Sequence, residues 1–163
     1  MSGKETNGDR HLARKGRGVD PVDRKILGLL AENADRSFAE LGSLPHLSPP
    51  AVHERVKRMK RDGTIKRTVA MLDAEKLGRD LLAFVHLETS NWETSRRVLG
   101  MASLDAVEEI HTVAGDTAMI LKVRMTSPGA LEEFLGELHQ MEGFKRVKTF
   151  VVLGTYAERG PYP

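Results

Sequence analysis

Apolar residues in the N-terminal half of the chain recur at helical spacing. In residues 20–33 they fall on one face, and in residues 48–61 they form a second stripe at 100° per residue. Between these segments, residues 37–44 begin with Ser37 and Glu40 at the spacing of a capping box. The pattern predicts three short helices packed in sequence. The stripe in residues 48–61, the third predicted helix, consists of Val52, Val56 and Met59.

The third segment has clear start and stop signals. Ser48 can cap a helix by accepting a hydrogen bond from a free first-turn N–H, and Pro49 then occupies the first helical position, where its missing N–H costs nothing. Gly63 can adopt the left-handed conformation that ends a helix. Residues 64–72 are rich in β-branched side chains and predict a small hairpin, the wing. Three helices followed by such a hairpin form a winged helix-turn-helix.

The C-terminal half alternates between strand and helix patterns. The order βαββαβ, with a tight turn between the middle strands, is the ferredoxin-like arrangement, so we expect an α+β protein. One face of such a sheet lies under its helices and the other is bare, and two stacked copies would hide it. The sequence therefore predicts a homodimer. The predicted strands are residues 81–88, 106–113, 117–125 and 146–153, and the predicted helices are residues 92–104 and 128–141.

Charge is distributed unevenly between the two halves. Residues 1–72 contain 15 Lys and Arg against 9 Asp and Glu, a formal charge of +6, whereas residues 73–163 contain 10 against 14, a formal charge of −4. A basic half with a helix-turn-helix indicates double-stranded DNA as partner, because displaced counterions supply much of the affinity. Residues 1–18 are predicted to be a flexible basic tail, which either follows the DNA backbone or, as we favour, aids solubility.

Composition argues against several other classes of protein. The chain has no cysteine, which excludes disulfides and thiolate metal ligands. No apolar run approaches the ~18 residues that span a membrane, and the N-terminus lacks the apolar core of a secretory signal. The six histidines have no metal-ligand spacing, and no phosphate loop or nucleophile motif is present. We expect a cytoplasmic, nucleoid-associated protein without catalytic residues, metal site or cofactor.

The exposed face of the third helix supplies the candidate DNA contacts. The first turns of a reading helix approach base edges, and cations further along it meet phosphates. Arg55, at the edge of the buried stripe, is expected to pair with Glu40 or Asp23 instead. The base or thymine-methyl candidates are Ser48, Pro49, Pro50 and His53, and the phosphate candidates are Lys57, Arg58 and Arg61, with Lys66 and Arg67 in the wing.

A simpler interpretation of these cations stays open. A charged run is most often only the solvated face of an amphipathic helix, and Lys66 and Arg67 would then be ordinary surface residues. The two helices upstream and the charge asymmetry favour DNA binding. A dimer would place two reading helices one or more turns of DNA apart, so the operator is expected to be a pseudo-palindrome.

Four stretches, in this order and spacing, resemble the Lrp/AsnC family of transcriptional regulators. They are VDPVDRKIL at residues 19–27, NADRSFAEL at 33–41, LSPPAVHERVKRMKRDGTI at 47–65 and VAGDTAMILKV at 113–123. The resemblance implies a DNA-binding winged helix followed by a βαββαβ domain that dimerises and binds amino-acid effectors. Assembly of dimers into tetramers or octamers is implied by the resemblance alone. The expected parts are residues 19–72 for the winged helix, 73–80 for the linker, 81–155 for the βαββαβ domain and 156–163 for a C-terminal tail.

One departure from the family pattern lies before the reading helix. Pro45 and His46 stand where the family has a small residue and a glycine. Pro45 is expected to end the second helix, because it lacks an N–H and crowds the preceding turn. His46 must then adopt the backbone conformation of the glycine, which histidine tolerates better than most residues.

The turn at Gly115 and Asp116 is a candidate effector site. Glycine lets a ligand approach backbone N–H groups, and the Asp116 carboxylate can receive an ammonium. A Gly-Asp pair between two strands is also an ordinary turn signal. The resemblance implies that this turn lines an amino-acid pocket between dimers, together with last-strand residues. Those residues match Phe150, Val151 and Val152.

A second departure follows this turn. Family members often continue Gly-Asp with an acid and a tyrosine, whereas Thr117 and Ala118 stand here. The loss of those polar groups predicts a less polar effector than usual, or none.

One enzyme class remains as an alternative. Sirohaem decarboxylases resemble this family but have a degenerate DNA-binding domain. The basic and well-capped third helix favours a regulator over such an enzyme. A third class, an effector-binding module without DNA function, is disfavoured by the charge asymmetry between the two halves.

Overall fold

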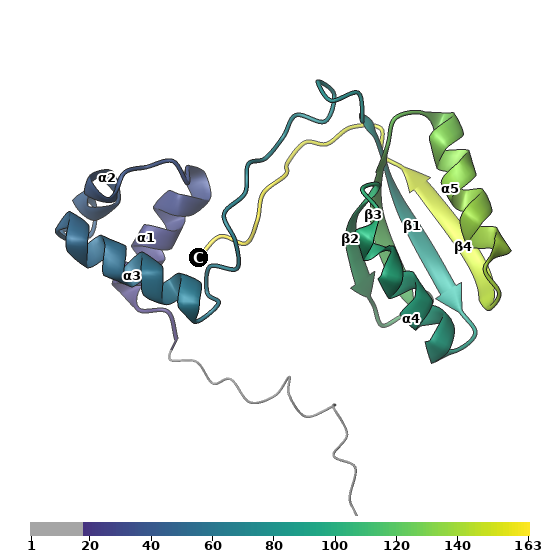
Figure 1. The fold of residues 1–163 in the computed structure, drawn as a ribbon, viewed down its shortest axis with the longest axis horizontal. Helices are drawn as coiled ribbons and strands as arrows, with labels where there is room; N and C mark the ends of the chain where they lie inside the picture. The colour runs from purple at the N-terminus through teal and green to yellow at the C-terminus, as the bar shows by residue number, and fades with distance from the viewer. Residues whose placement is uncertain (1–17) are drawn as a thin grey trace, which may run out of the picture. The chain divides into compact units, whose positions relative to one another are not determined.

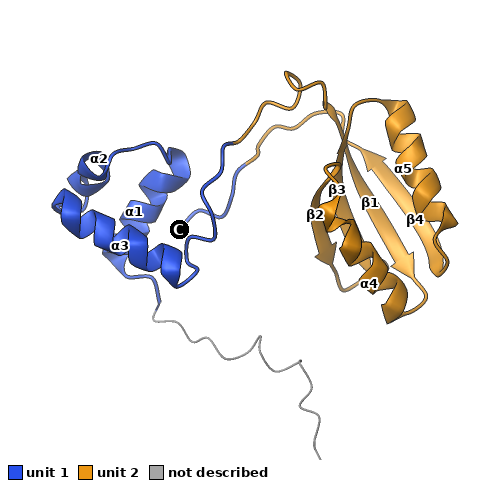
Figure 2. Ribbon diagram, in the orientation of Figure 1, with its two compact units in different colours: residues 1–70, 159–163 blue, residues 71–158 orange. Residues whose placement is uncertain are grey.

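The computed structural model describes residues 18–163, which form two compact units (Figures 1 and 2). The first unit contains the described residues up to 70 together with residues 159–163, and the second spans residues 71–158. The predicted basic tail at residues 1–18 lies almost wholly outside the described residues.

The first unit consists of the three predicted helices, α1 (Pro21–Glu32), α2 (Phe38–Ser43) and α3 (Pro49–Arg61). Asp20 caps α1 by accepting from the Asp23 N–H, and Ser37 and Glu40 form the predicted capping box at α2. These local signals set where the helices begin. The buried core of the unit consists of Ile26, Leu41, Val52, Val56 and Met59.

The turn between α2 and α3 depends on two unusual backbone positions. His46 has φ 55°, so it adopts the left-handed conformation expected for it. The Leu47 N–H donates to the Gly42 carbonyl at 2.9 Å. A Cβ at position 42 would lie 2.3 Å from the Leu47 carbonyl oxygen, so only glycine fits this turn.

Two predictions for the ends of α3 were wrong. Ser48 occupies the capping position, but its hydroxyl makes no capping hydrogen bond. Residues 64–72 form no strand, so the described chain has no wing hairpin. The segment is rich in β-branched residues, but it contains no Gly, Asn or Asp that would reverse the chain. Within the described residues it also pairs with no other strand.

The second unit has the predicted ferredoxin-like order. Its antiparallel sheet has the strand order β2-β3-β1-β4, and two helices and a short 3₁₀ turn connect the strands. The predicted helix 92–104 is shorter than expected, because it ends at Gly100 and tightens into the 3₁₀ turn. The elements are β1 (Leu81–Thr89), α4 (Trp92–Gly100), η2 (Met101–Ser103), β2 (Val107–Thr112), β3 (Met119–Met125), α5 (Pro128–Gln140) and β4 (Phe144–Val151).

The two faces of this sheet differ in character. Alternate residues of β1 and β3, such as Val85 and Leu121, are fully buried against α4 and α5. The opposite face, called here the open face, carries the other alternate residues, including Phe84, His86 and Lys122. Within residues 18–163, none of the helices combines the length and apolarity that crossing a bilayer requires.

Candidate nucleic-acid interface and ligand hollow

The predicted DNA-contacting residues all lie on exposed surface of the first unit. Because the apolar stripe of α3 is buried against α1 and α2, the helix presents its polar face to solvent. On α3 and at its cap these exposed residues are Ser48, Pro49, Pro50, His53, Lys57, Arg58 and Arg61, and in the extended segment after it they are Lys66 and Arg67.

Two arginines of α3 are tied to the start of α1. The Arg55 Nη1 lies 2.8 Å from Asp20 Oδ2 and 2.9 Å from Asp23 Oδ1, and Arg58 forms an ion pair with Asp23. The predicted Arg55–Asp23 pair is confirmed, whereas Glu40 is used by its capping box. Sequence reasoning missed Asp20, although its place before Pro21 marks it as a helix cap. This cluster fixes the reading helix against α1.

The electrostatics of the cluster favour its charged form. The backbone N–H of Asp23 and the Arg55 guanidinium together lower the pKa of Asp20 to about 2. The same ion pairs, with Asp23 and then Asp20, raise the pKa of Arg55. Both groups therefore stay ionised at neutral pH.

The remaining α3 cations are differently placed. No carboxylate of residues 18–163 lies within ion-pair distance of Lys57 or Arg61. The arrangement leaves these two cations available for an external anion, while Arg58 is partly committed to Asp23.

His53 is held by an aromatic neighbour from another helix. Its ring centroid lies 5.1 Å from that of Phe38, with an interplanar angle of 64°, which is an edge-on contact. Its Nδ1 lies 3.6 Å from a carboxylate oxygen of Glu54. His53 is therefore an exposed side chain with a defined position.

In the second unit, the turn before β3 is fastened to β1. The Thr117 hydroxyl and the Ala118 N–H both donate to the Leu87 carbonyl at 2.9 Å. Gly115 has φ 151°, a conformation that side chains rarely adopt. The turn thereby places Asp116 and Thr117 above the open face beside β1.

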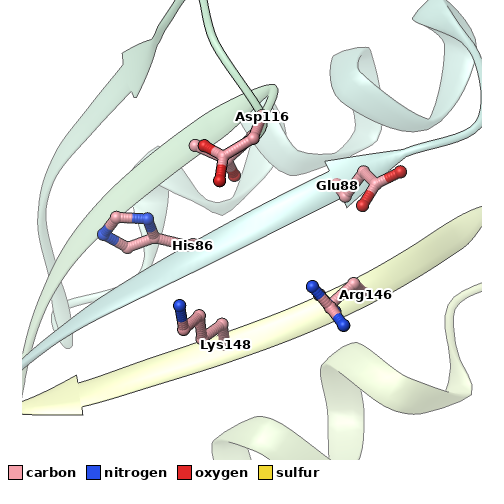
Figure 3. A pocket seen from close by; sticks show the side chains of 6 residues that line it. His86, Glu88, Asp116, Arg146 and Lys148 are labelled. Atoms are coloured by element: carbon pink, nitrogen blue, oxygen red, sulfur yellow. The ribbon is translucent and has the colours of Figure 1, made fainter.

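These residues border a polar hollow with an empty volume of ≈ 350 Å³ that is open to solvent. Figure 3 shows the carboxylates of Asp116 and Glu88 on one side and the cations of β4 on the other. The hollow is lined by His86, Glu88, Asp116, Thr117, Arg146 and Lys148.

The charges around the hollow do not neutralise one another. His86 faces Lys148, and Glu88 faces Arg146, in the register of β1 and β4. Even so, within the described chain no ion pair joins either carboxylate, Glu88 or Asp116, to Arg146 or Lys148; Glu88 has only a 4.0 Å contact with the exposed Lys145, which does not line the hollow. Opposite charges held apart across a hollow match a ligand that carries both signs.

The predicted effector residues are only partly brought together. Asp116 and Thr117 line the hollow, and Gly115 and Ala118 flank them. Phe150 borders it through contacts of its ring with His86, at 5.0 Å between centroids, and with the Lys148 ammonium, at 5.0 Å. Val151 and Val152 lie further along, beside Ala83 and Leu82.

Sequence reasoning missed four of the residues that line the hollow. They form two pairs at the spacing of alternate strand positions, so the signal that could have found them was polar residues recurring with period two on predicted strands. They are His86, Glu88, Arg146 and Lys148.

A second charged cluster lies on the open face beside the hollow. The Lys122 Nζ is 3.1 Å from Glu108, 3.6 Å from Glu109 and 2.9 Å from Glu158. Burial by itself lowers the pKa of Lys122, but the hydrogen bonds that its ammonium donates to Glu158 and Glu108 outweigh burial and raise that pKa. This cluster is internally paired and so is unlike the hollow. Among residues 18–163, no three His, Cys, Asp or Glu side chains are grouped to hold a metal ion.

Comparison with known proteins agrees with this division. An AsnC-type helix-turn-helix domain model matches residues 19–60, and an Lrp/AsnC ligand binding domain model matches residues 82–162. The leucine-responsive regulatory protein of Escherichia coli (strain K12) is 32% identical over 144 residues, covering 86% of this chain and 88% of its own. The chain belongs to the Lrp/AsnC family. It is a helix-turn-helix transcriptional regulator with a ligand-binding domain.

Other relatives extend this finding. The HTH-type transcriptional regulator FL11 of Pyrococcus furiosus is 28% identical over 145 residues, covering 89% of this chain and 96% of its own. The solved structure of E. coli AsnC superposes with a TM-score of 0.79 at 27% identity and covers 89% of this chain and 99% of its own.

A more distant structure shares the fold. It is a Neisseria meningitidis transcriptional regulator crystallised with L-Met, with a TM-score of 0.82 at 23% identity, covering 88% of this chain and 96% of its own.

Proposed function

We propose that this Lrp/AsnC-family regulator acts as a homodimer that reads a pseudo-palindromic operator with α3 and responds to a small zwitterionic ligand. The observation that carries the DNA-binding half is the exposed face of α3, where Lys57 and Arg61 have no carboxylate partner in the described chain. Such a protein would reside in the cytoplasm, on the nucleoid.

The N-terminal turn of α3 reads the bases in this proposal. Ser48, Pro49, Pro50 and His53 approach base edges or thymine methyl groups, because the first turns of a reading helix enter the major groove. The Ser48 hydroxyl supports this role, since it makes no capping bond within its own helix. The two prolines offer van der Waals contact only.

The cations further along contact phosphates. Lys57 and Arg61 do so directly, and Arg58 does so with the guanidinium N–H groups that its pair with Asp23 leaves free. Lys66 and Arg67 contribute from the extended segment after α3 rather than from a hairpin.

Binding to random-sequence duplex DNA at two salt concentrations, followed by selection and sequencing, tests the proposal. A pseudo-palindrome should be enriched, with affinity falling steeply as salt rises. Lys57→Ala should weaken all sequences alike and reduce the salt slope by about 1, whereas His53→Ala should change sequence preference. Lys145→Ala, which removes an exposed cation of the second unit, is the control. Binding without enrichment or salt dependence would refute the DNA-reading role.

The ligand is proposed to be a free amino acid in the hollow. A carboxylate would lie against Arg146 and Lys148 on β4, and an ammonium against Glu88 and Asp116 (Figure 3). Ion pairs of this kind gain strength from the partial exclusion of water. Within the described chain Asp116, Arg146 and Lys148 have no internal ion pair, and Glu88 has only a 4.0 Å contact with the exposed Lys145, so the four groups can turn to a ligand.

Calorimetric titration with each of the common amino acids tests this assignment. At least one should bind, and its amine and its acid analogues, each lacking one charge, should bind at least tenfold more weakly. Glu88→Gln and Lys148→Met should weaken binding, whereas Arg96→Met, which removes an exposed cation of α4 away from the hollow, should not. Equal binding of the amine analogue would show that the carboxylate is not recognised and that the assignment is wrong.

The sirohaem decarboxylase alternative makes an opposite prediction. Such an enzyme would have a vestigial reading helix. Here α3 exposes Lys57 and Arg61, and its apolar stripe is buried in the core of the first unit. A bound tetrapyrrole in the purified protein, visible by its absorbance, together with absent DNA binding, would favour the enzyme.

The proposed dimer forms through the open face of the sheet. Phe84 and Phe150 are opposite each other in the register of β1 and β4, and they are 36% and 46% exposed. Exposed aromatic residues on a sheet face that no helix covers favour burial against a second copy. Tetramers or octamers remain predictions from the family resemblance.

A further inference from the structure

Phe38 is a large apolar side chain that the core of the first unit does not use. It is the first residue of α2 and is 39% exposed. The buried and partly buried apolar residues that form the core of this unit do not include it. Its ring contacts the exposed ring of His53 on α3.

The contact between the two rings restricts His53. At 5.1 Å between centroids and 64° between planes, the pair has the edge-on geometry that aromatic rings prefer. The backbone that carries Phe38 is held by the capping box of Ser37 and Glu40 at the start of α2. Contact with the Phe38 ring therefore restricts the orientations open to the His53 imidazole before any base arrives.

We propose that Phe38 is a positioning residue for sequence reading, which fixes His53 for its base contact. Specificity at one base pair then depends on α2 as well as on α3. The inference rests on the proposed DNA-reading role and assigns His53 its orientation. Holding the ring in advance avoids the entropy cost of ordering it on DNA.

Two substitutions distinguish the effect of the Phe38 aromatic ring from that of an apolar side chain of similar size. Phe38→Leu keeps an apolar side chain but removes the aromatic partner, and Phe38→Tyr keeps the ring. Selection from random DNA should show that Phe38→Leu loses roughly threefold to tenfold discrimination at the base pair that His53→Ala also affects. Phe38→Tyr should retain it. The Phe38→Leu/His53→Ala double variant should lose no more than His53→Ala alone.

Three measurements distinguish positioning from a structural role. The thermal midpoint and the salt slope of binding should stay unchanged in Phe38→Leu, and Leu44→Ala, which removes another exposed apolar side chain near α2, should leave sequence preference intact. A uniform loss of affinity, additive effects in the double variant, or unaltered preference would overturn the inference while selective binding by the unmodified protein stands. Absent selectivity in the unmodified protein would overturn the proposed function as well.

Discussion

Asp20 has two roles at the start of α1. Its carboxylate accepts the Asp23 N–H as a helix cap, and it also binds the Arg55 guanidinium of α3 at 2.8 Å. The first contact and then the second lower its pKa to about 2. The folded protein therefore binds a proton at this position less readily than the unfolded chain, whose carboxyl has a pKa of 3.8.

This difference predicts how stability depends on pH. The contribution of Asp20 should be fully present above about pH 4 and should be lost as the pH falls toward 2. Asp20→Asn keeps a capping acceptor but has no charge to titrate. The stability advantage of the unmodified protein over this variant, measured by urea unfolding, should shrink by about 1 kcal/mol across that window, after allowance for solvent screening. A constant difference would show that the ion pair adds nothing.

At the scale of elements, the helices of the first unit begin in two different ways. α2 begins with a complete capping box, in which the Glu40 carboxylate accepts from the Ser37 N–H at 2.7 Å. α3 begins with Pro49 and without a side-chain cap, because Ser48 leaves its hydroxyl unbonded within the helix. Serine therefore stabilises α2 through its hydroxyl at Ser37, whereas the Ser48 hydroxyl at the start of α3 stays available for an external partner.

The two serines should respond differently to removal of the hydroxyl. Ser37→Ala should destabilise the first unit by about 1 kcal/mol, because the Glu40 N–H loses its acceptor and the Glu40 carboxylate loses the hydroxyl that donates to it. Ser48→Ala should change stability by less than about 0.5 kcal/mol but should weaken DNA binding. Chemical denaturation followed by the helical signal measures the first effect. An equal loss for both variants would mean that Ser48 caps α3 in solution.

The connection from α2 to α3 requires a glycine at position 42. Gly42→Ala should destabilise the first unit by more than about 2 kcal/mol, because its Cβ would lie 2.3 Å from the Leu47 carbonyl oxygen, a backbone atom. Gly136→Ala is the matched control in the interior of α5, where nothing lies within 4 Å of the added carbon, and it should be neutral or slightly stabilising. Thermal unfolding of the two variants decides the matter. Comparable stability would mean that the turn relaxes.

At the scale of the whole molecule, the open face of the sheet is the surface through which the proposed dimer forms. Its apolar centre at Phe84 and Phe150 lies beside the charged hollow and the paired Lys122 cluster. A stable interface needs about 800 Å² from each partner, which a four-stranded sheet face can supply.

A charge at the centre of that face should prevent assembly. Phe84→Glu should convert a dimer into a monomer of 18.1 kDa, because an unpaired carboxylate would be buried between the sheets. Trp92→Glu, which alters an exposed aromatic residue at the start of α4, should leave the dimer intact. Light scattering coupled to size exclusion measures both masses. The reverse outcome would place the interface on the helical side.

The sequence by itself determined the elements, because their signals act over a few residues. The apolar stripe of α3 and the capping box at Ser37 follow from local periodicity and cap chemistry, whereas the left-handed position of His46 was implied by the family resemblance, in which a glycine stands there. The alternating strands likewise predicted the ferredoxin-like order. The apparent hairpin after α3 was wrong, because β propensity is satisfied only where a partner strand exists.

Only the tertiary structure decided which side chains meet. Arg58 reaches Asp23 across 35 positions, and the hollow exists because the register of β1 and β4 sets His86 opposite Lys148 while a distant turn brings in Asp116. The Ser48 hydroxyl does not make the expected capping hydrogen bond, because its side-chain geometry is not set by the local sequence alone. Such contacts depend on packing and register between segments far apart in the chain, and no local pattern specifies them.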